Sequence, residues 1–294
     1  MPADRTHRDV KVHGVRLRVV EAGDGPVVVL LHGLFMDHRT WDAIVGDLSR
    51  EFRVVAPDLP GFGDSEKPPA NKFPYDVDSF AEVVADLYAG LDLGRAAVVG
   101  HALGGAIAIA LAARHPELVS RLVLVDSMCF EAPLDLRMRI ALLPFVGGFV
   151  LKQLWSRGTF RGLFRDAVLS GGNDALVEKV DRYYDAFNGP ASRGSALATL
   201  RATHDTRAIV AQTARIDAPT LVVWGRNDRS LPPRLGRRLA HEIRGAGFEL
   251  LDAAHAPHEE LPDQFSSLLL RFLRDERASG AWPLVVSKTG QSSG

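Results

Sequence analysis

Hydrophobic and polar positions follow two different spacings between residues 1 and 126. Apolar residues occupy every second position on either side of His13-Gly14, which predicts a β-hairpin between Val10 and Val19. The run Pro26–Leu31, PVVVLL, is apolar throughout, as expected of a strand that is buried on both faces. Three further short apolar runs predict strands: Arg53–Ala56, Ala96–Val99 and Arg121–Val125.

Segments with a helical spacing of apolar residues stand between these strands. They are Trp41–Leu48, Ser79–Leu91 and Leu103–Arg114. The alternation returns near the end of the chain, as a strand at Pro219–Trp224, a helix at Pro233–Ile243, a strand at Phe248–Leu251 and a helix at Pro262–Arg274. Strands that alternate with helices predict an α/β fold, with a mostly parallel central sheet and helices on both of its faces.

The segment from residue 127 to 216 breaks this rhythm. It has no clear strand and consists of helical pieces rich in Leu, Phe and Arg, separated by Gly and Pro. We therefore expect one α/β core domain, formed by residues 1–126 and 217–275, with a helical insertion at 127–216. Residues 276–294 end in Gly and Ser and are expected to form a C-terminal tail.

Composition narrows the kind of protein. The chain has 294 residues and a formal net charge of −1, so no overall field attracts nucleic acid or an acidic membrane. Cys129 is the single cysteine, which excludes an intrachain disulfide and a zinc-finger framework. The N-terminus lacks the apolar core of a signal peptide, and the apolar run Ile140–Trp155 is interrupted by Pro, Gly and Lys. We expect a soluble cytoplasmic protein, monomer or homodimer, without nucleic-acid or membrane partners.

A strand-to-helix turn carries the first chemical signal. Residues Gly100-His101-Ala102-Leu103-Gly104 fit the pattern G-x-S-x-G except at the central position. In that pattern the turn is strained, the central side chain points outward as a nucleophile, and the glycines relieve crowding by neighbouring backbone. Ala102 places a methyl group where the nucleophile would stand.

A second turn, His32-Gly33-Leu34-Phe35, follows the strand Pro26–Leu31. In catalytic turns of this kind, one backbone N–H from this loop and one from the residue after the nucleophile form an oxyanion hole. The donors are expected to be Leu34 and Leu103.

Two further positions complete the order that nucleophilic catalysis requires. Asp228 follows the strand Pro219–Trp224, and His255 follows the strand Phe248–Leu251. An acid just past a strand end can orient a histidine, and the histidine can then reach the turn as a base. Asp126, which ends an earlier strand, is the alternative acid and ranks behind Asp228.

With these residues in place, the chain resembles the α/β-hydrolase superfamily from about Val10 to Arg274. The segment PDLPGFGDSEKP, Pro57–Pro68, also looks like a loop of that family. The resemblance implies that Asp228 and His255 are the acid and the base, and that residues 127–216 form a cap over the active site. It is nearest to capped esterases, carbon–carbon bond hydrolases and the epoxide hydrolase and haloalkane dehalogenase branches, although the last two carry Asp at the turn.

Three explanations of Ala102 stay open. The chain is a Ser→Ala variant of a hydrolase, in which every other catalytic position is intact. Alternatively, Ala102 is native, and His255 with Asp228 activates water or the substrate directly, for hydrolytic, lyase or cofactor-free oxygenase chemistry. In the third case the protein uses the former active-site pocket to bind a ligand and catalyses no reaction.

The substrate is expected to be a small or medium apolar ester-like molecule. Aromatic side chains of the insertion and residues beside the two turns are the candidates for the pocket: Phe35, His101, Phe130, Phe145, Phe149 and Trp155. The chain has no glycine-rich phosphate loop after a strand, so no nucleotide cofactor is expected. The spacing of its His and acidic residues suggests no metal site.

Overall fold

An eight-stranded sheet forms the centre of the molecule. The computed structural model describes residues 5–131, 139–140, 142–143, 156–167 and 174–274. The strands are β1 (Arg5–Val12), β2 (Val15–Ala22), β3 (Val27–Leu31), β4 (Arg53–Pro57), β5 (Ala96–His101), β6 (Val119–Val125), β7 (Thr220–Gly225) and β8 (Gly247–Leu251). Their order in the sheet is β1-β2-β4-β3-β5-β6-β7-β8. Among the described strands, only the pairs that involve β2 are antiparallel, so the predicted mostly parallel sheet is confirmed.

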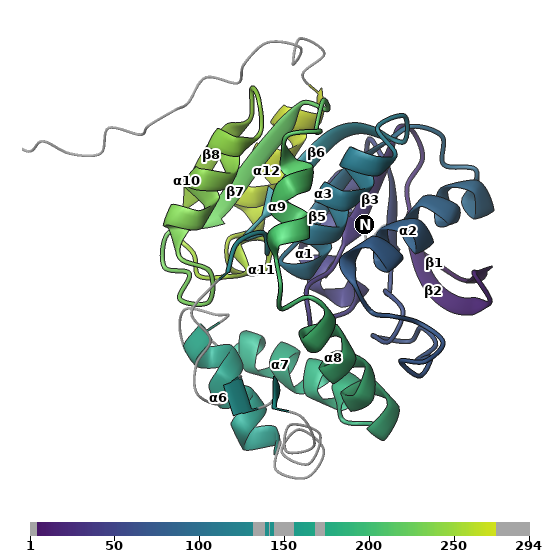
Figure 1. The fold of residues 1–294 in the computed structure, drawn as a ribbon. Coiled ribbons are helices and arrows are strands. Elements are labelled where there is room, and N and C mark those ends of the chain that lie inside the picture. The colour runs from purple at the N-terminus through teal and green to yellow at the C-terminus, as the bar shows by residue number, and fades with distance from the viewer. Residues whose placement is uncertain (1–4, 132–138, 141, 144–155, 168–173, 275–294) are drawn as a thin grey trace, which may run out of the picture.

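Helices cover both faces of this sheet (Figure 1). The helices of the α/β part are α1 (Asp42–Leu48), α2 (Val77–Leu91), α3 (Leu103–Arg114), α10 (Pro233–Glu242) and α12 (Pro262–Arg274). Val29 and Leu31 of β3 pack into the core that contains α2, α3 and α10. Val28 and Leu30 point to the other face and pack with α1 and α12. The apolar run of β3 is continuous because both of its faces are buried.

Between β6 and β7 the described chain is helical. Figure 1 shows α6 (Arg157–Ala167), α7 (Asp174–Phe187) and α8 (Pro190–Ala202) together at one end of the α/β part. A further helix, α9 (Arg207–Thr213), packs on α3 of the α/β part. The helical pieces expected in the insertion are confirmed where α6, α7 and α8 lie. Those expected between residues 134 and 155 lie almost entirely outside the described residues. The division into core, cap and tail stays a prediction.

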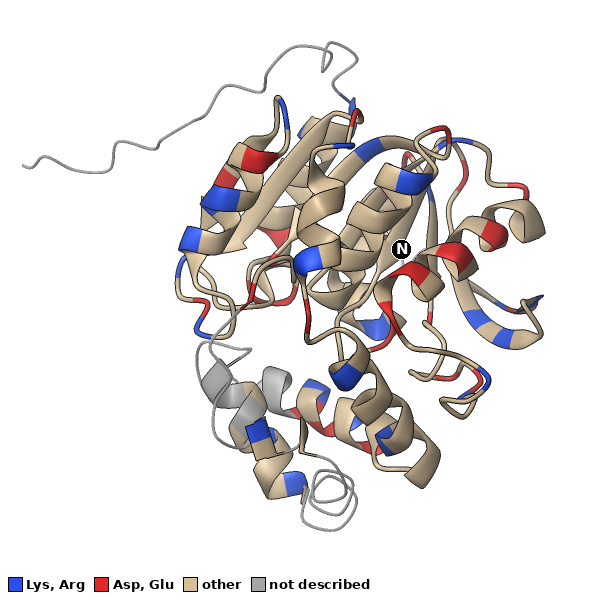
Figure 2. Ribbon diagram, viewed as in Figure 1, with Lys and Arg blue, Asp and Glu red and all other residues tan. Residues whose placement is uncertain are grey.

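Figure 2 shows Lys and Arg positions interspersed with Asp and Glu positions along the described ribbon. Within the described ranges, no helix combines the length and apolar character needed to cross a bilayer. Cys129 is buried.

Candidate active site

The turn between β5 and α3 has the strained geometry that its sequence predicts. Ala102 has φ 48° and ψ −109°, a conformation that non-glycine residues rarely adopt. Its N–H donates to the carbonyl oxygen of Val125 at 3.0 Å, and its own carbonyl accepts from the N–H of Met128 at 3.0 Å. The end of β6 therefore holds the turn from both sides.

The glycines of this turn are required by close backbone approach. A Cβ atom at Gly104 would lie 2.1 Å from the carbonyl oxygen of Leu31, and one at Gly100 would lie 2.3 Å from the carbonyl oxygen of Gly104. Both distances are far below van der Waals contact, so the predicted crowding of the turn is present.

Asp228 and His255 form a buried hydrogen-bonded pair. The ring N–H at Nδ1 of His255 donates to Oδ2 of Asp228 at 2.7 Å. The other carboxylate oxygen of Asp228 accepts from the backbone N–H groups of Ser230 at 2.8 Å and Leu231 at 2.9 Å. Three donors thus fix the carboxylate, which fixes the imidazole tautomer and leaves the lone pair at Nε2 for the cavity that His255 lines.

His101 supports the backbone of His255. Its Nε2 lies 2.7 Å from the carbonyl oxygen of His255, and because a carbonyl only accepts, the proton of the ring is at Nε2. Burial, reinforced by the neighbouring rings of His258 and His255, holds the pKa of His101 well below its usual range. His101 is therefore neutral and holds the loop that carries the predicted base.

Leu34 and Leu103, the expected oxyanion donors, both line the same cavity as Ala102. Leu103 is the first residue of α3, where a backbone N–H has no partner inside the helix. Among the described residues, neither amide nitrogen donates to another protein group. The two amides are thus available to a ligand, and the positive end of α3 favours negative charge at this point.

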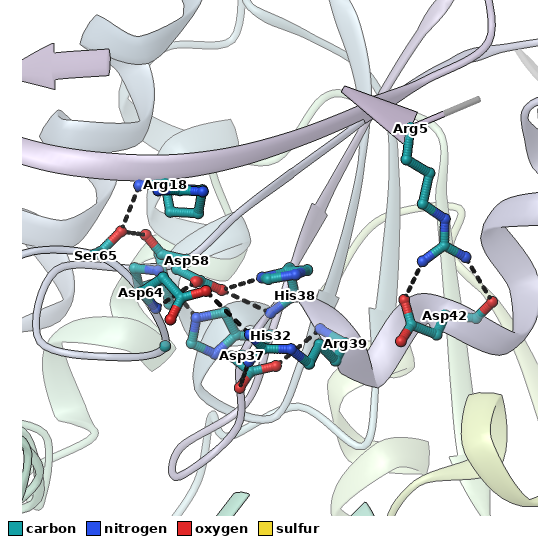
Figure 3. Close-up of polar contacts among 12 residues, drawn as sticks. Arg5, Arg18, His32, Asp37, His38, Arg39, Asp42, Asp58, Asp64 and Ser65 are labelled. Carbon is teal, nitrogen blue, oxygen red and sulfur yellow. Dashed lines mark hydrogen bonds and ion pairs between the residues drawn. The ribbon is translucent and has the colours of Figure 1, made fainter. Parts of the chain in front are cut away.

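The loop that carries Leu34 is held by a buried polar network around Asp58 (Figure 3). The backbone N–H of Leu59 donates to Nε2 of His32 at 3.0 Å, so His32 donates through Nδ1 to the carbonyl oxygen of Gly33 at 2.8 Å. Oδ1 of Asp58 accepts from the backbone N–H and from Nδ1 of His38, each at 2.8 Å. This network fixes the turn after β3 at both of its ends.

A mostly apolar cavity of about 190 Å³ lies over Ala102. The expected pocket residues Phe35 and His101 line it. The remaining described side chains that line the cavity are Met36, Met128, Phe164, Thr199, Leu200, Thr203, Ser230 and Leu231. Most of these come from α8 and from the loops after β6 and β7.

Phe130 was expected in this pocket, and the structure corrects that prediction. Its ring is buried beneath the guanidinium group of Arg238 on α10, 4.1 Å from the ring centre, and is not among the described residues that line the cavity. A cation over an aromatic face is favourable. The other three expected pocket residues, Phe145, Phe149 and Trp155, lie outside the described residues.

Asp126 lies close to the predicted acid and base, Asp228 and His255, which together form the predicted dyad. It has φ 41°, is fully buried, and its Oδ1 accepts from the backbone N–H of Gly225 at 2.9 Å. Single ligand atoms of Asp126, Asp228 and His255 all lie within 4.8 Å of one another. His255 nevertheless pairs with Asp228, as expected.

The short helix α11 (Pro257–Glu260), directly after His255, is tied to α7. The buried carboxylate of Glu259 accepts from the hydroxyl groups of Thr40 and, at 2.8 Å, Tyr183, and lies 3.4 Å from Nζ of Lys179. Sequence reasoning missed this cluster because its members are far apart in the chain.

Two clusters of described residues have the spacing of a metal site, namely Asp37, His38 and Asp58, and Asp126 with the dyad. In the first, both carboxylate oxygens of Asp37 are already bonded to Arg39. A guanidinium group in this position disfavours a second cation.

A parallel sheet with a strained strand-to-helix turn, followed by an acid and a histidine after the next strands, defines an α/β-hydrolase. A family model described as "alpha/beta hydrolase fold" matches residues 26–262, and the chain belongs to this family. Among curated proteins, it is 31% identical to the pimeloyl-[acyl-carrier protein] methyl ester esterase of Nitrosomonas europaea, over 85% of this chain and 97% of that protein.

Two solved structures share the fold over nearly the whole chain. The enol-lactonase from Burkholderia xenovorans LB400 is 26% identical, with a TM-score of 0.77 over 90% of this chain and 99% of that one. The meta-cleavage product hydrolase CumD from Pseudomonas fluorescens IP01 is 25% identical, with a TM-score of 0.76 over 90% and 97%. The latter structure is a serine-to-alanine mutant complexed with acetates.

Proposed function

We propose that this protein is a serine-hydrolase scaffold for small apolar ester-like substrates, in which Ala102 stands in place of the nucleophilic serine. The observation that carries the proposal is that His255, hydrogen-bonded to the buried Asp228, lines the same apolar cavity as Ala102. A methyl group has no proton that a base could remove, whereas a hydroxyl group at the same position would be activated by His255.

Each residue has a role in the complete reaction. A hydroxyl at position 102 would attack the acyl carbon while His255 takes its proton and later returns it to the leaving group. Asp228 keeps the imidazole in the required tautomer, and the N–H groups of Leu34 and Leu103 stabilise the oxyanion. With Ala102 no acyl-enzyme forms, and loss of the nucleophile costs about 10⁶-fold in turnover in subtilisin.

The size and chemistry of the cavity support an ester with a small acyl group. Its volume of about 190 Å³ is only slightly larger than that of an engineered cavity of about 150 Å³ that holds benzene. Two of the similar proteins are named for ester bonds, one a methyl ester esterase and one an enol-lactonase. We therefore place small esters first and lactones next.

A second candidate is direct hydrolysis with a native alanine. The lone pair at Nε2 of His255 is available to a water molecule as well as to a hydroxyl group, and Leu34 and Leu103, whose amides are the expected oxyanion donors, line the same cavity. In this route His255 removes a proton from water as its oxygen attacks the acyl carbon, and then returns the proton to the alcohol oxygen as the ester bond breaks, so no covalent enzyme intermediate forms.

The test is the Ala102→Ser variant, assayed beside the parent chain on short and medium chromogenic esters. We expect a gain of several orders of magnitude in turnover with a burst of product, and its loss in the double variants that add His255→Gln or Asp228→Asn. A folded Ala102→Ser protein that stays inert on esters would overturn the serine-hydrolase proposal. Turnover by the parent chain that disappears in His255→Gln would establish the direct route instead.

A further inference from the structure

The carboxyl group of Asp126 has no role in the proposed reaction, yet it lies beside the residues that carry it out. It is fully buried at the end of β6, and its Oδ1 accepts one hydrogen bond, from Gly225. Its Oδ2 is buried and, among the described residues, receives no N–H or O–H donor. A buried carboxylate oxygen without a donor is costly, so this atom requires an explanation.

The two neighbouring carboxyl groups are unequally supplied with donors. Asp228 accepts from two backbone N–H groups and from the ring of His255, whereas Asp126 accepts from one backbone N–H. Two buried carboxyl groups this close cannot both ionise at moderate cost, and one proton is shared between them. Hydrogen-bond donors stabilise the ionised form, so the charge belongs on Asp228 and the proton on Asp126.

We propose that Asp126 is a positioning residue that stays protonated and donates its proton, from Oδ2, to the carboxylate of Asp228. The bond gives the orphaned oxygen a partner and adds a fourth donor to Asp228, which holds that carboxylate toward His255. It also limits the buried acid pair to one negative charge. The proposal treats Asp228 and His255 as a proton-transfer pair, and to that extent it rests on the proposed function.

The other charged groups around Asp126 also favour its protonated form. Asp228 and His255 face it from the loops after β7 and β8, and Glu260 faces it from α11. Burial, followed by the negative charge of Asp228 and a hydrogen bond between the two side chains, holds the pKa of Asp126 well above its usual range, and Glu260 adds to this effect.

The protonation state of Asp126 changes the charge that His255 experiences. A unit charge at 4.8 Å, the upper limit of the separation, shifts the protonation of an imidazole by about 1.3 to 2.5 pH units at an effective dielectric constant of 40 to 20. A protonated Asp126 adds no such shift. Replacing it by asparagine, which is neutral and presents an N–H donor at the same place, should therefore change little.

The experiment compares the parent chain with Asp126→Asn and Asp126→Ala by two measurements that need no turnover. Difference infrared spectra near neutral pH should show the carbonyl band of a protonated carboxyl group in the parent, and this band should be missing from Asp126→Asn. Histidine NMR, with the signal of residue 255 assigned through His255→Gln, should show a protonation midpoint for Asp126→Asn within about 0.3 pH units of the parent.

The remaining outcomes decide the proposal. Absence of the carboxyl band in the parent, or a fall of the midpoint by a full unit or more in Asp126→Asn, means that Asp126 is ionised and overturns it. In Asp126→Ala the carboxylate of Asp228 loses a donor, and we expect the midpoint to rise by about half a unit. An unchanged midpoint in a folded Asp126→Ala protein shows that no such bond exists.

These measurements are made on the chain with Ala102, so they stay valid if the Ala102→Ser variant proves inactive. If that variant is active, adding Asp126→Asn to it should leave the pH profile of turnover of Ala102→Ser unchanged.

Discussion

Replacement of Lys179 on α7 by methionine should destabilise the protein by an amount that grows with pH. Within the described structure, the Lys179 ammonium group forms an ion pair with the Glu259 carboxylate, at 3.4 Å, and the carboxylate side chain is only 1% exposed. The variant leaves this buried charge with two neutral donors, the hydroxyl groups of Thr40 and Tyr183. Breaking a buried ion pair in this way costs about 3–5 kcal/mol when the remaining charge has no relief.

Protonation of Glu259 sets an upper limit on this cost. Burial already raises the pKa of Glu259 above the ordinary value of 4.5, although Lys179 and the two hydroxyl donors lower it. A carboxyl group that takes up a proton on folding costs about 1.4 kcal/mol for each pH unit above 4.5, which is about 4 kcal/mol at pH 7.5 and about 1.4 kcal/mol at pH 5.5. We expect Lys179→Met to lose about 2–3 kcal/mol at pH 7.5 and about 1 kcal/mol at pH 5.5.

The direction of this pH dependence follows from the linkage between protonation of Glu259 and folding. A folded-state pKa above the unfolded value means that the contribution of Glu259 to stability is largest at low pH and is lost as the pH rises through the folded-state pKa. Removal of Lys179 raises that pKa further and steepens the loss.

Urea unfolding of a double-mutant cycle measures these quantities. Glu259→Gln is the matched control, because glutamine accepts from the same hydroxyl groups without a charge, and we expect it to cost less than about 1 kcal/mol. Lys179→Met/Glu259→Gln should be more stable than Lys179→Met alone by about 1–2 kcal/mol at pH 7.5. A double variant no more stable than Lys179→Met, or a loss that is constant between pH 5.5 and 7.5, would refute the reasoning.

Three further predictions concern the backbone and the network under the turn after β3. Ala102→Gly should raise stability in urea by about 0.5–1.5 kcal/mol, because glycine adopts φ 48° without strain; a lower unfolding midpoint would contradict this. Burial opposes protonation of His38, but the hydrogen bond from His38 to Asp58 outweighs burial and raises the pKa of His38. Stability should therefore fall as the pH rises above about 6.5, and His38→Gln should flatten that pH dependence in urea unfolding. Gly104→Ala should lower the thermal midpoint through a loss of about 3 kcal/mol or more, whereas the control Gly46→Ala, which meets nothing within 4 Å, should cost nothing.

The sheet and the long helices were predictable because their apolar residues repeat over several periods. The strand at Pro26–Leu31 and the helix at Leu103–Arg114 appear with nearly the expected bounds. Three short helices were missed: the 3₁₀ helix at His38–Trp41, α9 and α11. Each has seven residues or fewer, about two turns at most, so a helical period is hard to distinguish from a loop, although α1, which also has seven residues, was predicted.

The candidate site was predictable where chain order fixes position, and less so where tertiary packing does. Asp228 and His255 follow neighbouring parallel strands, so their pairing follows from the sheet itself. Phe130 also follows a strand, but its ring turned toward Arg238 because the direction of a side chain in a loop depends on what packs over it. The lining contributed by α8, such as Thr199 and Leu200, depends on how that helix lies over the sheet, which no local pattern records.

The strain at Ala102 has a purpose that does not depend on a nucleophile. The left-handed φ of Ala102 turns the chain sharply from β5 into α3, so that the N–H of Leu103 opens the helix beside the cavity. A relaxed turn would move that amide away from Leu34 and separate the two donors expected to bind an oxyanion. Attack by a hydroxyl group and attack by water both place negative charge on the same oxygen, so both routes need the two amides together. A need to hold these two amides together would account for a strained turn that carries a methyl group, and Ala102→Gly, which relieves the strain while permitting the same φ, should keep the two amides in place.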